Sequence, residues 1–289
     1  MIVITGATGT VGRLLIEVLT ETGADVRAVS RAPEVAGLPA GVEVVPGDPA
    51  QPATMAAALH GATSLFLHPR AAGSDPHLLV SIAREQGVRR VVALAAANVD
   101  DDPDLQPSRA RGDRNREADH AAATSGLEWT SLRPSSFASN AATAWAPQIR
   151  AGDTVAYVYP GFEESPIHER DLAAVAARAL LTDELLGRRP VLTGPDSLSH
   201  ERMVAIIGEV IGRPLRFAEV SAVVAARGMV GRGLPEPFVT ALMDRYAAYL
   251  DRPQHPATDE AERILRRPAR SFADWAADNA TAFTARADA

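Results

Sequence analysis

The sequence predicts an α/β protein built on an open, doubly wound parallel sheet, and three observations support this prediction. Short apolar runs alternate with segments of helical periodicity through the first half of the chain, as in strand–helix–strand units. A glycine-rich loop directly follows the first apolar run. Gly87 and Gly126 fall where helices should end before the next strand.

Six strands are expected in this half, each a short apolar run. They cover residues 2–5, 26–30, 42–45, 64–67, 91–95 and 129–132. Helices should connect them, because apolar residues recur on one helical face between the runs. The expected helices lie around 14–19 and over 52–59, 76–86 and 108–124.

After about residue 150 the pattern changes and becomes mostly helical. A hairpin-like segment is expected at 154–159, with Pro160 and Gly161 as its turn. Further strands are expected at 190–193 and 215–220, and helices at 170–181, 199–211, 221–230, 236–250, 258–266 and 271–283. The segment 231–237 is the connection expected to be most mobile. We expect one domain over residues 1–150, which elements near 154–193 can rejoin, and a smaller capping region over 151–289.

The composition excludes several kinds of chemistry. All 29 basic residues among the 289 are arginine, and the chain contains neither lysine nor cysteine. Mechanisms that need a lysine amine or a cysteine thiolate are therefore excluded, together with disulfides and thiolate metal sites. A high-GC coding bias explains the missing lysines. Asp100, Asp101 and Asp102 have no histidine at metal-ligand spacing, so no metal site is expected.

The charge pattern indicates a protein that acts on small molecules. The net charge is −7 and the arginines are scattered among acidic residues, which argues against a nucleic-acid partner. No apolar stretch approaches 18 residues, so neither a signal peptide nor a membrane span is expected. We expect a cytoplasmic protein without membrane partners, and an oligomer remains an open alternative.

The loop from Gly6 to Gly12 is the strongest motif. It reads Gly6-Ala7-Thr8-Gly9-Thr10-Val11-Gly12 between the first strand and the first helix. In a Rossmann fold such a loop binds a dinucleotide, because its glycines permit a tight turn, approach of a pyrophosphate and close helix packing. Thr8, Thr10 and Val11 complete the expected cofactor loop. At the end of the second strand, Ser30 and Arg31 stand where an acidic residue would favour NAD. They favour NADP(H), although a solvated arginine would also explain Arg31.

Several motifs together resemble the NmrA-like family of atypical short-chain dehydrogenase/reductase proteins, including its quinone-reductase-like members. The opening Ile2-Val3-Ile4-Thr5-Gly6-Ala7-Thr8-Gly9, the pair Gly47-Asp48 and the segment from Ser125 to Asn140 are similar to family motifs. So are the stretches 170–176 and 192–195. The resemblance implies that Asp48 lies against the adenine and that Pro134 borders the nicotinamide.

The chain departs from the wider superfamily at the catalytic positions. Counting back from Ser125-Gly126 places Arg111 where the usual tyrosine stands and Asn115 where the usual lysine stands. The ordinary tyrosinate mechanism of alcohol oxidation is therefore absent. Hydride delivery to a quinone, azo or enone group remains available, because the cofactor performs that step. A loss of catalysis in a redox sensor would leave the same pattern.

His68 and Asn98 are the remaining catalytic candidates, since each follows a strand whose carboxyl end should face the ligand. His68 has an ordinary pKa suited to proton transfer and is also a cofactor-binding candidate, although a loop-capping histidine would look the same. Arg111 and Asn115 should point from one helix toward the same crevice, where Arg111 would stabilise a developing oxyanion. The substrate-side candidates are Ser135, Phe137, Trp145, Phe162 and His168. Core packing would explain the aromatic residues equally well.

These observations favour an NADPH-dependent reductase of a quinone-like, enone or conjugated carbonyl compound, of the kind used in secondary metabolism. Two alternatives remain open. One is a non-enzymatic NADP(H)-binding redox sensor of the NmrA type, and the other is an isomerase or lyase on the same fold.

Overall fold

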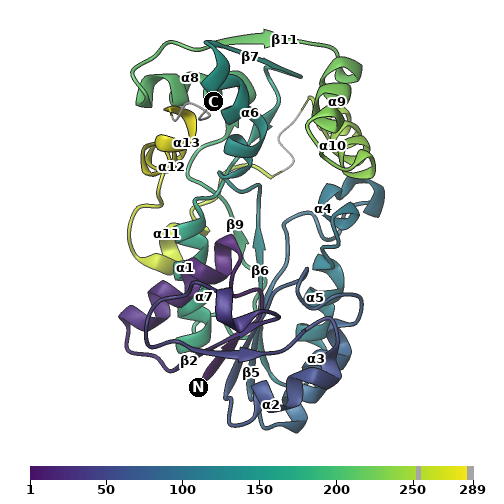
Figure 1. Ribbon diagram of the computed structural model, residues 1–289, viewed down its shortest axis with the longest axis vertical. Coiled ribbons are helices and arrows are strands. Elements are labelled where there is room, and N and C mark those ends of the chain that lie inside the picture. The colour runs from purple at the N-terminus through teal and green to yellow at the C-terminus, as the bar shows by residue number, and fades with distance from the viewer. Residues whose placement is uncertain (252–254, 285–289) are drawn as a thin grey trace. The chain divides into compact units, whose positions relative to one another are not determined.

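The computed structural model describes residues 1–251 and 255–284 and confirms the α/β architecture (Figure 1). Seven strands form one sheet in the order β3-β2-β1-β4-β5-β6-β9. These strands are β1 (Ile2–Ile4), β2 (Val26–Ser30), β3 (Glu43–Pro46), β4 (Ser64–Leu67), β5 (Arg90–Leu94), β6 (Glu128–Pro134) and β9 (Val191–Leu192). Because β1 lies between β2 and β4, the chain winds outward from β1 in both directions, so the doubly wound prediction is right.

The register aligns the carboxyl ends of the strands along one edge of the sheet. Ile2 pairs in parallel with both Val26 and Ser64, and the pairs β2–β3, β4–β5 and β5–β6 are parallel as well. In parallel sheets of this kind, ligands bind outside the carboxyl edge. The loops that follow β1, β2, β4 and β5 therefore position the candidate site.

Helices cover both faces of this sheet. On one face α1 (Thr10–Glu21) packs against α7 (Glu169–Leu181), and on the other lie η2 (Pro52–Met55), α2 (Ala56–Leu59), α3 (Pro76–Glu85) and α5 (Asn115–Ala123) (Figure 1). Leu15, Ile16 and Leu19 of α1 are fully buried. The opposite face buries Leu65, Leu67, Leu79 and Val91 among others in one core cluster. Burial of these apolar side chains is the main stabilising contribution to the layered fold.

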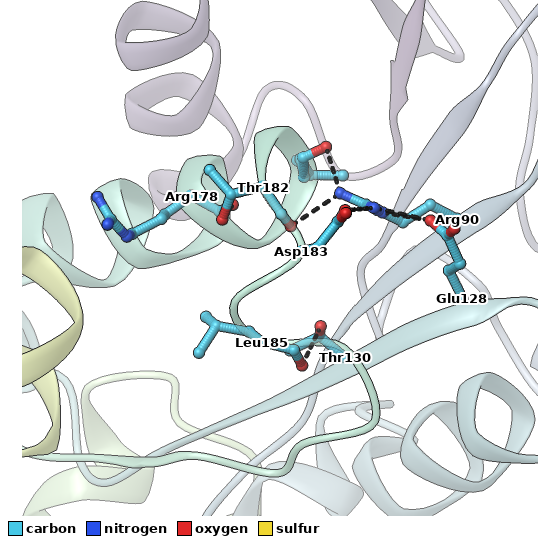
Figure 2. Close-up of polar contacts among 8 residues, drawn as sticks. Arg90, Glu128, Thr130, Arg178, Thr182, Asp183 and Leu185 are labelled. Atoms are coloured by element: carbon cyan, nitrogen blue, oxygen red, sulfur yellow. Dashed lines mark hydrogen bonds and ion pairs between the residues drawn. The ribbon is translucent and has the colours of Figure 1, made fainter.

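Arg90, at the start of β5, anchors the carboxyl end of α7 to the sheet (Figure 2). Its guanidinium donates to the carbonyl oxygens of Leu180, at 3.3 Å, and Thr182, at 2.8 Å. It also pairs with Glu128, at 2.7 Å, and with Asp183. A cation at a helix carboxyl terminus satisfies its unpaired carbonyls and complements its dipole. The contact fixes α7 at the edge opposite the candidate site.

The chain forms two compact units that are each discontinuous in sequence. The first comprises Met1–Asp100, Gly112–Pro134 and Glu169–Val191. The second comprises Asp101–Arg111, Ser135–His168 and the described part of Leu192–Ala289. Among the described residues, no helix is both long and apolar enough to cross a membrane.

The second unit corrects the hairpin expected at residues 154–159. β7 (Thr154–Tyr157) pairs in parallel with the distant β11 (Arg216–Glu219), with Val155 opposite Phe217. β8 (Glu163–Glu164), which follows the Pro160-Gly161 turn, pairs instead with β10 (Leu198–Ser199) in antiparallel fashion. The strands on either side of the Pro160-Gly161 turn therefore pair with different distant partners and not with each other.

The remaining elements of the second unit are mostly helices. They are η3 (Pro103–Leu105), α4 (Pro107–Ala110), α6 (Asn140–Ala151), α8 (His200–Val210), α9 (Ala222–Gly231), α10 (Glu236–Ala248), α11 (Glu260–Leu265), α12 (Phe272–Asp278) and α13 (Thr281–Thr284). Helix α9 continues through Gly231, so the connection expected over 231–237 is reduced to residues 232–235. The core of this unit is rich in aromatic side chains, which include Trp145, Tyr157, Phe162, Tyr246 and Trp275.

Candidate functional site

The glycine loop lies at the carboxyl end of β1 and leads directly into α1. Gly6 has a φ of +66°, which lies in the left-handed region that favours glycine. A Cβ at Gly12 would stand 2.2 Å from the carbonyl oxygen of Gly6, so a side chain there would push the helix away from the loop. At Gly9 the closest atom would be 3.3 Å away. Backbone geometry therefore requires glycine at positions 6 and 12.

The amino terminus of α1 is open to an anion. Its N-cap is Gly9, which supplies no side-chain cap, and its first turn contains no acidic residue. The first N–H groups of a helix have no intrahelical acceptor, and here they belong to Thr10, Val11 and Gly12. Such donors, together with the helix dipole, bind phosphate groups. The residues present therefore fit the pyrophosphate of a dinucleotide.

Ser30 and Arg31 follow this loop at the next strand end. Arg31 is exposed just beyond β2, and it forms no ion pair within the described residues. The hydroxyl of Ser30 accepts a hydrogen bond from the N–H of Ala32 at 3.1 Å, which orders the turn. Arginine at this strand end suits the 2′-phosphate of NADP. That role remains a prediction.

Asp48 lies beside the same strand end. The N–H of Gly47 donates to the carbonyl of Ser30 at 3.1 Å, which joins the ends of β2 and β3. The Asp48 carboxylate accepts from the N–H of Ala50 at 3.1 Å and from the amide of Gln51 at 3.0 Å. These bonds order its own turn, and a contact with adenine stays a prediction.

His68 packs directly against the glycine loop. A Cβ at Gly6 would lie 2.7 Å from His68 Cγ, so the imidazole covers the first glycine. The His68 N–H donates to the hydroxyl of Thr5 at 2.8 Å, and the N–H of Arg70 donates to His68 Nδ1 at 3.3 Å. With Nδ1 as acceptor, we assign the proton of the neutral ring to Nε2.

The environment of His68 differs from the one expected for a proton donor. Burial lowers the pKa of His68 to about 4, outweighing the smaller opposing effect of the Asp113 carboxylate. The expectation of a pKa suited to proton transfer near neutrality is not met, because the buried ring is neutral there. His68 can still donate a hydrogen bond from Nε2–H.

Arg111 and Asn115 do not share one helix, which corrects the helix expected over residues 108–124. Helix α4 ends at Ala110 with Arg111 as its C-cap, Gly112 has a φ of +92°, and α5 begins at Asn115. A left-handed residue cannot continue a right-handed helix, so the segment breaks. Arg111 belongs to the second compact unit, where its guanidinium lies 5.1 Å from the ring centre of Phe238. Asn115 is buried in the first unit.

Asn98 lies shortly after the end of β5, and Pro134 is the last residue of the neighbouring β6. The N–H of Ala95 donates to the carbonyl of Leu132, and that of Ala97 donates to the carbonyl of Pro134, both at 2.8 Å. The strand pairing thus extends past β5 up to the half-buried Asn98. Both candidates lie at the carboxyl edge of the sheet, and their contacts with cofactor or substrate remain predictions.

Ser135, Phe137 and His168 belong to the second unit, and their substrate roles remain predictions. The Ser135 hydroxyl donates to the carbonyl of Ser165 at 2.5 Å. Phe137 is half-buried and forms a parallel bridge with Ile167. His168 is buried, with Nε2 3.4 Å from a carboxylate oxygen of Asp278.

Trp145 and Phe162 are components of the second unit's aromatic core. Only 3% of Trp145 and 1% of Phe162 is exposed. The Trp145 ring lies 5.7 Å from that of Tyr157, and the Phe162 ring lies 4.5 Å from that of Tyr246, measured between ring centres. Packing against these neighbours explains their burial, and a substrate role for either residue remains a prediction.

Comparison with known proteins identifies the family. Residues 6–183 match a family model described as NAD(P)H-binding. This match spans more than half of the chain. The chain belongs to the NAD(P)H-binding family.

Two relatives match nearly the whole length of this family member. The (4-alkanoyl-5-oxo-2,5-dihydrofuran-3-yl)methyl phosphate reductase of Streptomyces griseus is 35% identical over 98% of this chain and 99% of the relative. The NAD(P)H azoreductase of Xenophilus azovorans is 30% identical over 99% of this chain and 100% of the relative. The expectation of an NAD(P)H-dependent oxidoreductase is confirmed.

Solved structures share the fold of this NAD(P)H-binding protein. An NADPH-dependent quinone oxidoreductase of Escherichia coli superposes with a TM-score of 0.82, at 22% identity, over 96% of this chain and 99% of that chain. The triphenylmethane reductase of Citrobacter sp., in complex with NADP(H), gives a TM-score of 0.80 at 20% identity over 97% and 100% of the two chains. The resemblance to NmrA-like atypical short-chain dehydrogenase/reductase proteins is confirmed.

Two arginines near the NAD(P)H-binding loop were not anticipated from the sequence. Arg13 donates to the carbonyl of Gly37, which is 24 residues away, and Arg70 forms a two-pronged ion pair with Asp113, which is 43 residues away. Both Arg70–Asp113 bonds are 2.8 Å long. Sequence spacing gives no signal for either contact, because the fold alone brings these partners together.

Proposed function

We propose that the protein is an NADPH-dependent reductase that delivers hydride to a quinone-like, enone or other conjugated carbonyl compound. The observation that carries this proposal is a glycine loop open to a pyrophosphate, beside an exposed Arg31 at the end of β2. The loop suits the dinucleotide, and the arginine suits the additional phosphate of NADPH.

The names of the relatives support an electron-poor double bond as the acceptor. The furanone named for the Streptomyces griseus reductase contains a ring alkene with two carbonyl groups attached to the same alkene carbon, and the Xenophilus azovorans enzyme is named for azo compounds. NADPH, when bound, supplies the hydride for such an acceptor. A conjugated carbonyl compound also disperses the negative charge that follows hydride addition.

The proton that completes the reduction comes from solvent in this proposal. Arg111 and Asn115 stand at the positions of the usual tyrosine and lysine, and the chain contains no lysine. His68 has a pKa of about 4 and is neutral near pH 7. Nε2–H of His68 and the side chain of Asn98 are assigned to hydrogen bonding and orientation of the ligands.

The first test follows loss of NADPH absorbance with a panel of quinones, azo dyes, enones and polycyclic ketones. Turnover of at least one conjugated acceptor is expected. Absence of turnover, together with tight and unequal binding of NADP and NADPH, would instead indicate a redox sensor. Conversion of a substrate without net loss of NADPH would indicate an isomerase or lyase.

The second test examines cofactor choice. Arg31→Glu is expected to weaken binding of NADPH more than binding of NADH, because the new carboxylate repels the 2′-phosphate. Arg89→Glu is a matched control, since Arg89 is also exposed but precedes β5 at the amino edge of the sheet. Equal effects of Arg31→Glu on the two cofactors would contradict the NADPH assignment.

A further inference from the structure

Arg13, in the first turn of α1, joins two separate segments. Its Nε donates to the carbonyl of Thr8 in the glycine loop at 2.9 Å. Its two Nη groups donate to the carbonyls of Gly37, at 2.7 Å, and Ala36, at 2.8 Å, in the segment that follows Arg31. One guanidinium thus bridges the two segments that are expected to hold the phosphates of the cofactor.

The segment between Arg31 and Ala36 links Arg31 to the carbonyls that Arg13 holds. It contains the short helix η1 (Pro33–Val35), in which the N–H of Ala36 bonds to the carbonyl of Pro33. At its start, the N–H of Ala32 bonds to the hydroxyl of Ser30. A continuous series of local hydrogen bonds therefore connects the strand end at Ser30 to the carbonyls that Arg13 holds.

The charge of Arg13 is not neutralised by its partners. All three acceptors are uncharged carbonyl oxygens, and within the described residues Arg13 forms no ion pair with a carboxylate. An arginine fork held by several acceptors is geometrically rigid, which a lysine ammonium cannot reproduce. Arg13 therefore combines a fixed geometry with a positive charge beside the glycine loop.

We propose that Arg13 is a positioning residue that determines cofactor specificity. It holds the segment after Arg31 at a set distance from the glycine loop, so that the pyrophosphate and the 2′-phosphate of one NADPH are bound together. This inference rests on the proposed assignment of Arg31 to the 2′-phosphate. NADH lacks that phosphate, so its binding should depend little on Arg13.

The experiment measures binding of NADPH and NADH to the full-length chain by cofactor fluorescence, which requires no substrate. Arg13→Gln is expected to raise the dissociation constant of NADPH about tenfold, or about 1.4 kcal/mol, and to leave that of NADH within about twofold. In an Arg31→Ala background, the same change should add little, because the contact that it positions is already lost. Arg13→Lys should remain impaired, because it cannot bridge the three carbonyls.

Arg27→Gln is the matched control for general loss of stability. Arg27 also donates to two backbone carbonyls, those of Ala58 and His60 at 2.8 Å, but it stands near the amino end of β2. Its substitution should not change the ratio of NADPH to NADH affinity. Thermal unfolding of every variant then separates folding defects from changes in specificity.

The outcomes distinguish this inference from the proposed function. Equal weakening of both cofactors by Arg13→Gln, additivity with Arg31→Ala, or full rescue by Arg13→Lys would overturn the positioning role. A selective effect of Arg31→Ala without one of Arg13→Gln overturns the inference alone. An unchanged cofactor ratio in Arg31→Ala overturns the NADPH assignment and, with it, this inference.

Discussion

The imidazole of His68 lies against the backbone of Gly6, so that a Cβ at position 6 would come within 2.7 Å of His68 Cγ. This contact joins the end of β4 to the start of the cofactor loop. The shape of the loop therefore depends on a side chain 62 residues farther along the chain.

Gly6→Ala should lower both the melting temperature and the affinity for NADPH. The new methyl group would collide with His68, and the φ of +66° would add about 1–2 kcal/mol of backbone strain. The double variant Gly6→Ala with His68→Ala should recover part of the melting temperature, because only the collision is relieved. Calorimetry measures the melting temperatures. If the losses of the two single variants simply add in the double variant, the collision with the His68 ring does not contribute to the cost of Gly6→Ala.

Gly12→Ala should lower the free energy of unfolding more than Gly9→Ala does, and both substitutions should weaken NADPH binding. At position 12 the Cβ would meet a backbone oxygen at 2.2 Å, which no side-chain rotation relieves, whereas at Gly9 the distance is 3.3 Å. Such overpacking costs about 1–3 kcal/mol. Gly231→Ala, at the end of α9 with no atom within 4 Å of its Cβ, is the control that should leave binding unchanged. Urea unfolding and cofactor titration measure the two effects.

Stability should fall as the pH is lowered from about 6.5 to about 4, in part because of His68. Above this range the His68 imidazole is neutral in both the folded and the unfolded protein. Within it, the histidine of the unfolded chain binds a proton at its ordinary pKa of about 6.5, while the ring in the folded protein, with its pKa of about 4, does not. The unfolded state is therefore favoured on acidification.

His68→Asn tests this pH dependence, because an amide oxygen can replace Nδ1 as acceptor and does not titrate. The variant should show a shallower loss of stability over the same pH range in urea unfolding. His200, whose pKa is also lowered by burial, contributes the same slope to both proteins. Identical pH profiles for the two proteins would contradict a buried neutral His68.

Arg90→Ala should destabilise the first unit by about 2 kcal/mol without changing cofactor preference. The substitution leaves the carbonyls of Leu180 and Thr182 without their donor and removes the pairs with Glu128 and Asp183 (Figure 2). Glu128→Gln should cost less, because Glu128 is half exposed and exposed ion pairs contribute little. Denaturant unfolding compares the free energies of unfolding of the two variants. A larger loss of stability in Glu128→Gln than in Arg90→Ala would contradict the capping role of Arg90.

The parts of the fold that were predictable from sequence are those encoded by local pattern. Strands β2 and β4 occupy the expected residues 26–30 and 64–67, because an apolar run between turn residues is a local signal. The glycine loop was recognisable because the constraints that require glycine there are local. They are the positive φ of Gly6 and the close approach of Gly12 to the carbonyl oxygen of Gly6. The missing lysine and the residues at positions 111 and 115 were likewise evident from composition and spacing.

The features that depend on distant partners follow from the folded arrangement of the chain and not from local pattern. The segment 154–157 became a strand beside residues 216–219 instead of one arm of a hairpin, since a strand pairs with whichever backbone the fold brings near it. The left-handed Gly112 separates Arg111 from Asn115. His68 is held neutral by burial, and Arg13 finds its carbonyl acceptors beyond β2. Burial and long-range hydrogen bonds arise from packing, so the sequence determined the cofactor loop while the tertiary structure decided its surroundings.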